Sequence, residues 1–165
     1  MQAPFRAAVL TVSDRCARAE RPDLSGPALR NLLTSRLPAI IAAFEIVPDD
    51  PEAIAGQVTA WSHPDQKIDL VVTTGGTGLA PRDNTPEAVR RVLEREHPGL
   101  LELARLRCYE KTPKTYLSRG TAGTRNRTLI LTLPGSPRGA TEMLEALLDV
   151  LPHAIETVRG EVVDG

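Results

Sequence analysis

Residues 68–88 read Ile68-Asp-Leu-Val-Val-Thr-Thr-Gly-Gly-Thr-Gly-Leu-Ala-Pro-Arg-Asp-Asn-Thr-Pro-Glu-Ala88, and the rest of the chain is organised around them. They begin with an apolar, β-branched run ending at Val72, which is typical of a strand buried on both faces. A glycine loop, Gly75–Gly78, follows. We expect a helix to begin next, with Thr85 as its N-cap and Pro86 at its first position. This order of elements can cradle an anion, because free backbone N–H groups and the helix dipole favour negative charge.

The glycine loop matches neither of the two common phosphate-binding motifs. It lacks the Gly-Lys-Ser/Thr ending of a P-loop, and the third glycine of a dinucleotide fingerprint would fall at Pro81. An ordinary tight turn between strand and helix is therefore the alternative interpretation. Arg82 and Asp83, placed between the loop and the helix, favour a binding site.

Composition excludes several classes of protein. The 165 residues are 41% hydrophobic and 3% aromatic, which predicts one domain spanning 1–165 with a core of Leu, Val, Ile and Ala. No apolar run is long enough to cross a membrane and no signal pattern begins the chain, so we expect a cytoplasmic protein without membrane contact. The net charge of −1 argues against general nucleic-acid binding. The two cysteines and three histidines show no metal-ligand spacing.

One segment departs from this even balance of charge. Residues 105–127 contain seven basic residues and a single acid, Glu110. A solvent-exposed face is the usual meaning of such a run. A patch that steers an anionic substrate is the alternative.

Strands are predicted to alternate with helices along the chain. Apolar runs predict further strands at residues 5–12, 40–47 and 128–133. Apolar residues at helical spacing predict helices over 28–37, 51–61, 86–93, 100–106 and 137–151, with Pro152 kinking or restarting the last one. Asp50 is expected to cap the helix that begins at Pro51. Residues 111–127 are the least regular part.

This alternation predicts an α/β fold, a three-layer sandwich whose mostly parallel central sheet is flanked by helices. Polar or glycine residues follow four of the expected strands, at Ser13-Asp14, Asp49-Asp50, Gly75 to Asp83 and Pro134 to Ser136. The carboxyl ends of parallel strands meet at one rim of a sheet, and ligands bind there. We therefore expect these segments to form a single site.

Motifs spread over nearly the whole chain recur together in one known family. They are Leu10-Thr-Val-Ser-Asp14, Asp23-Leu-Ser-Gly26, Val47-Pro-Asp49, Thr74-Gly-Gly-Thr-Gly78, Pro81-Arg-Asp83, Thr85-Pro-Glu-Ala88, Pro98-Gly99, Leu117-Ser-Arg119 and Leu133-Pro-Gly135. In this combination the chain resembles the molybdopterin adenylyltransferases of the Mog/MoaB type, a family that includes the gephyrin G domain. It departs from that family at Asn84, where valine is usual, and at Ser136, where Asn or Gln is common.

The resemblance implies molybdenum cofactor biosynthesis, in which Mg-ATP adenylylates the phosphate of molybdopterin and pyrophosphate is released. It implies ATP as substrate, Mg²⁺ as cofactor, a homotrimer, and a downstream molybdenum-insertion protein that takes the product. Bringing several negative charges together demands positioning and charge neutralisation, and Mg²⁺ accepts one or two carboxylates plus phosphates.

Carried over residue by residue, the resemblance assigns three groups of site residues. The catalytic group is Asp49, Asp83 and Ser118, of which Asp49 and Asp83 are also the metal ligands. The nucleotide-binding group is Gly75, Gly76, Thr77 and Gly78, with Gly135 and Ser136 as the opposite wall. The molybdopterin-binding group is Ser13, Asp14, Ser118 and Arg119, since an arginine can fork onto phosphate oxygens.

Two of these residues could instead have ordinary structural roles. Asp49 could form an Asx-turn ahead of a helix, and Ser118 could be an ordinary loop serine. At the level of the whole chain, two other functions remain open. One is a non-catalytic protein that binds molybdopterin or a nucleotide, and the other is a CinA-type nucleotide hydrolase of the same fold.

Overall fold

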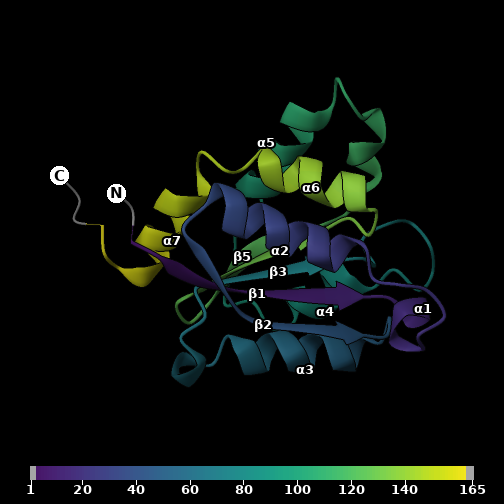
Figure 1. Cartoon of the computed structure of the whole chain (residues 1–165), viewed down its shortest axis with the longest axis horizontal. Helices are drawn as coiled ribbons and strands as arrows, with labels where there is room; N and C mark the ends of the chain where they lie inside the picture. The colour runs from purple at the N-terminus through teal and green to yellow at the C-terminus, as the bar shows by residue number, and fades with distance from the viewer. Residues whose placement is uncertain (1–2, 163–165) are drawn as a thin grey trace.

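A six-stranded sheet forms the centre of the protein (Figure 1). Its strand order is β2-β1-β3-β6-β5-β4. The computed structural model describes residues 3–162. Its strands are β1 (Phe5–Val12), β2 (Ala39–Val47), β3 (Leu70–Thr74), β4 (Arg95–Glu96), β5 (Ala122–Arg125) and β6 (Thr128–Leu133). Its helices are α1 (Asp14–Ala17), α2 (Ser25–Arg36), α3 (Pro51–Trp61), α4 (Thr85–Arg90), α5 (Gly99–Cys108), α6 (Pro137–Glu145) and α7 (Leu151–Arg159), with 3-10 turns at Pro64–Gln66 and Pro113–Leu117.

The sheet is mostly parallel. Strand β1 pairs in parallel with β2 and β3, and β3 pairs in parallel with β6. Strand β5 runs in the opposite direction and pairs antiparallel with both β6 and β4. The expected α/β fold with a mostly parallel sheet is therefore confirmed.

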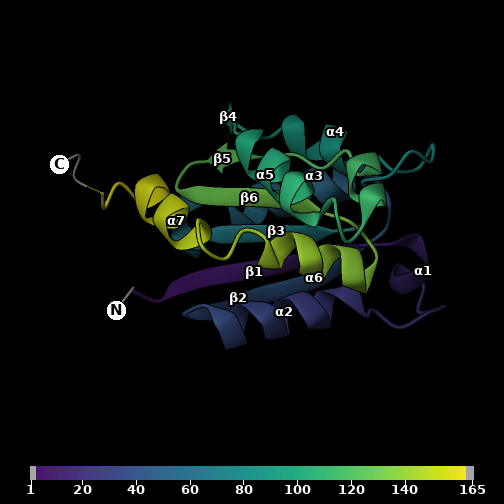
Figure 2. The ribbon, with the colours of Figure 1, turned by 90° about the horizontal axis from the view of Figure 1, so that it is seen from above.

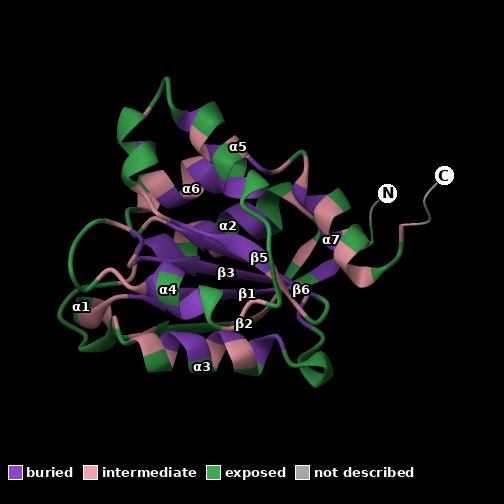
Figure 3. Ribbon diagram, turned by 180° about the vertical axis from the view of Figure 1, so that it is seen from behind, coloured by how far each residue is buried: buried purple, intermediate pink, exposed green. Residues whose placement is uncertain are grey.

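Helices cover both faces of this sheet and make two separate hydrophobic cores. Helices α2, α5, α6 and α7 pack on one face, where Phe5 and Val9 of β1 point. Helices α3 and α4 pack on the other face, where Leu10 and Val12 of the same strand point. Because successive side chains of a strand point to opposite faces of the sheet, β1 contributes residues to both cores. Figure 2 shows the strands side by side, and Figure 3 shows that the strands in the middle of the sheet are buried.

The carboxyl ends of β1, β2, β3 and β6 lie side by side, and we call this edge of the sheet the rim. Val12 pairs with Val47, and Thr74 pairs with Thr11 on one side and Leu133 on the other. The predicted convergence of the four strand ends is correct. At the opposite end of the sheet, Arg159 of α7 donates from Nη2 to the carbonyl oxygen of Pro4 (3.1 Å) and forms a bidentate pair with Asp69 (2.7 and 2.8 Å).

Two local predictions are wrong at helix α4. Asn84, rather than Thr85, is the N-cap residue, and Thr85 is the first helical residue. The Thr85 side chain is fully buried against Gly76. The helix also ends at Arg90 instead of reaching Leu93, because Glu94 N–H donates to the carbonyl oxygen of Thr124 and the chain turns into the sheet.

Two strands were not predicted. β4 is two exposed residues long, and β5 lies in the segment expected to be irregular. The short helix α1 was not predicted either. The last helix was predicted to reach Leu151, but α6 ends at Glu145 and residues 146–150 form turns. Pro152 then stands at the second position of the separate helix α7. The remaining predicted strands and helices are present. Within residues 3–162, no helix has the length and apolar character needed to span a membrane.

Candidate functional site

The glycine loop after β3 has a backbone that only glycine adopts without strain. Gly75 has φ +109° and Gly76 has φ +68°, both in the left-handed region. A Cβ on Gly75 would overlap the carbonyl oxygen of Val12, and one on Gly76 would overlap Oγ1 of Thr85. Gly135 faces the loop from the end of β6, with its Cβ position 3.2 Å from the Cα of Gly75. Gly135 therefore lies against the glycine loop, and its contact with a nucleotide stays a prediction.

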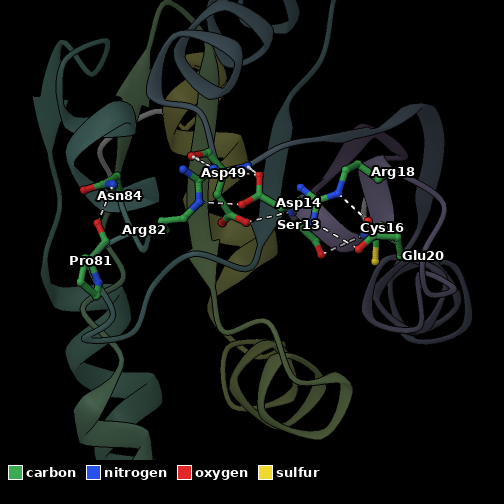
Figure 4. A network of polar contacts seen from close by, with 9 residues as sticks. All are labelled: Ser13, Asp14, Cys16, Arg18, Glu20, Asp49, Pro81, Arg82 and Asn84. Carbon is green, nitrogen blue, oxygen red and sulfur yellow. Dashed lines mark hydrogen bonds and ion pairs between the residues drawn. The ribbon is translucent and has the colours of Figure 1, made fainter.

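Two aspartates from neighbouring strand ends bind each other's backbone. Asp14 N–H donates to Oδ2 of Asp49 (2.9 Å), and Asp49 N–H donates to Oδ1 of Asp14 (3.0 Å). Arg82 reaches across from the loop after β3 and binds the Asp14 carboxylate with two nitrogens, at 2.6 and 2.9 Å (Figure 4). Both oxygens of the Asp14 carboxylate therefore accept hydrogen bonds. Among the described residues, no donor contacts Oδ1 of Asp49.

The environment of these carboxyl groups moves their pKa values in opposite directions. Burial raises the pKa of Asp49, and the negative charges of Asp14 and Asp83 act in the same direction. The hydrogen bonds from Arg82 lower the pKa of Asp14. A cation close to Asp49 would therefore favour the ionised form of that carboxyl group.

Asp83 completes the acidic side of the rim. Its Oδ2 accepts from Ala80 N–H (3.1 Å) and lies 2.8 Å from where a Cβ on Gly78 would be. Within residues 3–162, no group of three or more His, Cys, Asp or Glu side chains is arranged to hold a metal. Two carboxylates with free oxygens still fit Mg²⁺, because that ion commonly takes one or two carboxylates and completes its shell with phosphates and water.

Ser118 lies next to the glycine loop although it is far from it in sequence. Its hydroxyl donates to Oγ1 of Thr77 (3.0 Å). The loop that carries it follows the 3-10 turn Pro113–Leu117. Ser118 is half-buried, so its hydroxyl is reachable from the adjoining cavity.

Arg119 is occupied by contacts within the protein. Its Nε donates to the carbonyl oxygen of Gly78 (2.8 Å), Nη2 donates to that of Asp83 (2.6 Å), and Nη1 pairs with Glu87. Its backbone N–H also donates to the carbonyl oxygen of Thr77 (2.7 Å). This geometry gives Arg119 a role in holding the glycine loop. Its contact with molybdopterin stays a prediction.

Two cavities open on the two sides of the glycine loop. The first cavity, of about 460 Å³, is lined by Thr77, Gly78, Lys114 and Ser118 among others. The second cavity, of about 380 Å³, is lined by Ser13, Asp49 and Gly75 among others. Both cavities are lined by Gly76, Asp83, Gly135 and Ser136. Every predicted site residue except Asp14 and Arg119 lines at least one of these two cavities.

Two predicted site residues also cap helices. The Ser13 hydroxyl accepts from Cys16 N–H (3.2 Å) at the start of α1. The Ser136 hydroxyl accepts from Gly139 N–H (3.0 Å) at the start of α6. Ser136 is one of the two positions where the chain departs from the family pattern, and here it keeps a capping role.

Sequence reasoning missed several residues of the first cavity. Lys114 lines it and has no ion pair among the described residues, and Thr112 lines it while donating to Glu142 (2.8 Å). The excess of basic residues in 105–127 was the one signal that pointed to Lys114. Most of that segment's arginines bind inside the protein instead: Arg105, Arg107, Arg119 and Arg125.

Comparisons with known proteins agree over almost the whole chain. The family model described as a probable molybdopterin binding domain matches residues 8–153. The molybdopterin adenylyltransferase of Helicobacter pylori is 39% identical over 153 residues, which cover 92% of this chain and 86% of that protein. The molybdenum cofactor synthesis protein cinnamon of Drosophila melanogaster is also 39% identical, over 93% of this chain. The chain spans only about a quarter (26%) of cinnamon.

Among solved structures, the molybdopterin biosynthesis enzyme MoaB of Thermus thermophilus has the same fold. It superposes with a TM-score of 0.89 and is 54% identical, covering 94% of this chain and 97% of that one.

Proposed function

This chain belongs to the family of probable molybdopterin binding domains, and from that premise we propose that it adenylylates molybdopterin with ATP. An oxygen of the molybdopterin phosphate attacks the α-phosphorus of ATP. The bond from that phosphorus to the oxygen bridging to the β-phosphorus breaks, and pyrophosphate leaves with the electron pair. The observation that carries this proposal is the meeting of the glycine loop, two aspartates and Ser118 at one rim with two cavities.

The two cavities suit two anionic substrates whose reacting groups must be aligned with each other. Gly75 N–H donates to the carbonyl oxygen of Leu133 (3.1 Å). The N–H groups of Gly76, Thr77 and Gly78 have no acceptor among the described residues and can bind phosphate oxygens. Holding both reactants in one geometry is a large part of the catalysis of such transfers. We assign the nucleotide to the glycine loop with Gly135 and Ser136, and the pterin to the side of Ser118.

Asp49 and Asp83 would hold Mg²⁺ between them and the phosphates. The ion would supply neutralisation of the charge that builds up on the phosphate oxygens. The raised pKa of Asp49, caused first by burial, means that a cation at this place favours its ionised form. The third carboxylate, that of Asp14, is already paired with Arg82, so Asp49 and Asp83 are the ones that we assign to the ion.

Ser118 is assigned the donation of a hydrogen bond to the reacting phosphate. In the structure its hydroxyl already has a partner, Oγ1 of Thr77. Donation to the phosphate therefore requires the Ser118 hydroxyl to rotate away from Thr77. Because charge develops on that phosphate in the transition state, loss of the donor should affect turnover more than binding.

Pyrophosphate release separates the proposed transferase from both alternatives. The wild-type protein should release pyrophosphate from Mg-ATP only when molybdopterin is added. A non-catalytic binding protein releases none, and a CinA-type nucleotide hydrolase acts on a nucleotide without molybdopterin. Either of these results would refute the transferase.

Variants test the individual roles. Ser118→Ala should lower turnover by about 100- to 1,000-fold and leave ATP affinity nearly unchanged. Asp49→Asn and Asp83→Asn keep size but remove charge, so each should raise the Mg²⁺ concentration needed for half-maximal activity. Unaltered Mg²⁺ dependence in both aspartate variants would end the metal assignment. A lower melting temperature of Asp49→Asn with normal Mg²⁺ dependence would make Asp49 a turn former only.

Assembly and place of action are part of the same proposal. We infer a single-domain cytoplasmic protein that forms a homotrimer and passes its product to a molybdenum-insertion protein, as in the family that the motifs resemble. Light scattering after size-exclusion chromatography would measure the mass of the assembly. A monomer at micromolar concentration would contradict the trimer and leave the proposed chemistry at the rim in place.

A further inference from the structure

One arginine that binds the loop carrying Ser118 has no acidic partner among the described residues. Arg105 lies in the last turn of α5, and across residues 3–162 its guanidinium forms no ion pair with a carboxylate. Its Nε donates to the carbonyl oxygen of Ser118 (3.1 Å), and its Nη2 donates to that of Gly120 (2.8 Å). Burial lowers the pKa of Arg105. A charge that is partly removed from water needs hydrogen-bonding partners, and here two backbone carbonyls supply them.

These two carbonyls belong to the loop that carries the Ser118 hydroxyl. On its other side, the loop is bound to the glycine loop through Arg119 N–H and Thr77. Gly120 packs so closely on β6 that a Cβ there would overlap the carbonyl oxygen of Thr132. Next along the chain, Thr121 N–H donates to Oγ1 of Thr132 (2.6 Å). The loop is thus held between the glycine loop, strand β6 and the Arg105 guanidinium.

We propose that Arg105 is a positioning residue for the adenylyl transfer: its guanidinium fixes the peptide groups that follow Ser118 and Gly120, and thereby keeps the Ser118 hydroxyl at the first cavity. This inference rests on the proposed function of Ser118. The planar guanidinium binds two carbonyls in a fixed fork, which the compact ammonium of lysine cannot reproduce. Misplacement of a reacting group by about 1 Å can cost about 100-fold in rate.

Arg105→Lys tests this role, and Arg107→Lys is its matched control. Arg107 lies two residues further along the same helix and binds Ala146 and Asp149, away from the cavity. Arg105→Lys should lower kcat for pyrophosphate release by about 10- to 100-fold with little change in KM for ATP. Arg107→Lys should keep the wild-type kcat. Wild-type kcat in Arg105→Lys, or an equal loss in both variants, would overturn the proposal.

A double-mutant cycle with Ser118→Ala distinguishes positioning from a merely structural role. If Arg105 acts through the hydroxyl, then Arg105→Lys should cost little more, within about twofold, once the hydroxyl is gone. A structural role predicts the same loss of kcat in both backgrounds. Persistence of the full loss in the Ser118→Ala background would therefore contradict the proposal.

Amide hydrogen exchange tests the positioning without relying on turnover. Arg105→Lys should speed exchange at the amides of Arg119 and Thr121 relative to Arg107→Lys, because the loop loses one of its three attachments. Unchanged exchange would overturn the positioning role even if kcat fell. If the wild-type protein released no pyrophosphate, the proposed function would fail, and the exchange rates would still decide whether Arg105 holds the loop.

Discussion

Replacing Gly75 by alanine should destabilise the protein by about 2–6 kcal/mol, the combined range of two effects. A non-glycine residue at φ +109° strains the backbone by about 1–3 kcal/mol. The new Cβ would also overlap the carbonyl oxygen of Val12, which lies at the end of β1 next to Val47 of β2. Because that atom belongs to paired backbone, it cannot move aside easily, and such overpacking costs about 1–3 kcal/mol. Domains are stable by about 5–15 kcal/mol in total, so the loss is a large fraction.

Alanine in place of Gly56 is the control, and it should change the free energy of unfolding in the opposite direction. Gly56 lies on the exposed side of α3, and no atom is within 4 Å of its Cβ position. Alanine there should stabilise the helix by about 0.5–1 kcal/mol. Urea unfolding followed by circular dichroism measures both variants against the wild type. If Gly75→Ala were as stable as the wild type, or if both variants shifted in the same direction, the described loop geometry would be refuted.

Three further outcomes are expected. Arg159→Met should lower the free energy of unfolding by about 1–3 kcal/mol, because it leaves the Asp69 carboxylate without its bidentate partner. Melting curves measure this, and pyrophosphate release per folded molecule should stay normal since the pair lies opposite the rim. Arg82→Gln should move the acid limb of the profile of kcat against pH to higher pH. The reason is that the positive charge of Arg82 lowers the pKa of Asp49, so without Arg82 the Asp49 carboxyl stays protonated to higher pH. An unmoved limb, or one moved to lower pH, would contradict this. Lys114→Gln should weaken molybdopterin binding and make it depend less on salt concentration, since exposed charges are screened over about 10 Å at 0.1 M salt. Arg127→Gln, at the other end of the sheet, should change neither. Equal salt dependence in both variants and the wild type would refute the idea that this basic segment steers an anionic substrate.

The parts of the fold that follow local patterns could be predicted from the sequence. Strands β1 and β6 have the predicted bounds because each is a buried apolar run between polar segments. Asp50 caps α3 as expected, since its side chain accepts from Ala53 N–H (2.9 Å). The convergence of the strand ends follows from the parallel sheet, and parallel strands follow from the alternation with helices.

What could not be predicted depends on contacts between distant parts of the chain. Strand β4 consists of the exposed residues Arg95 and Glu96, and it exists only because β5 lies beside it. Thr85 has the ideal chemistry of an N-cap, but packing against Gly76 turns it into the first helical residue. The Arg82 contact with Asp14 joins residues 68 positions apart, so no local spacing signals it. Arg105 was counted as one more charge in a basic segment, and only the structure shows which carbonyls it binds.

The contact between Arg159 and Pro4 has a practical consequence for protein engineering. It holds the two ends of the described chain together at the end of the sheet that faces away from the rim (Figure 1). The eight residues of β1 separate that end from the rim by about 26 Å at 3.3 Å per residue. An affinity tag, a fluorescent reporter or a surface-immobilisation handle attached at either end would therefore leave both cavities open to solution. Closing the chain into a circle through a short linker and reopening it elsewhere is feasible for the same reason.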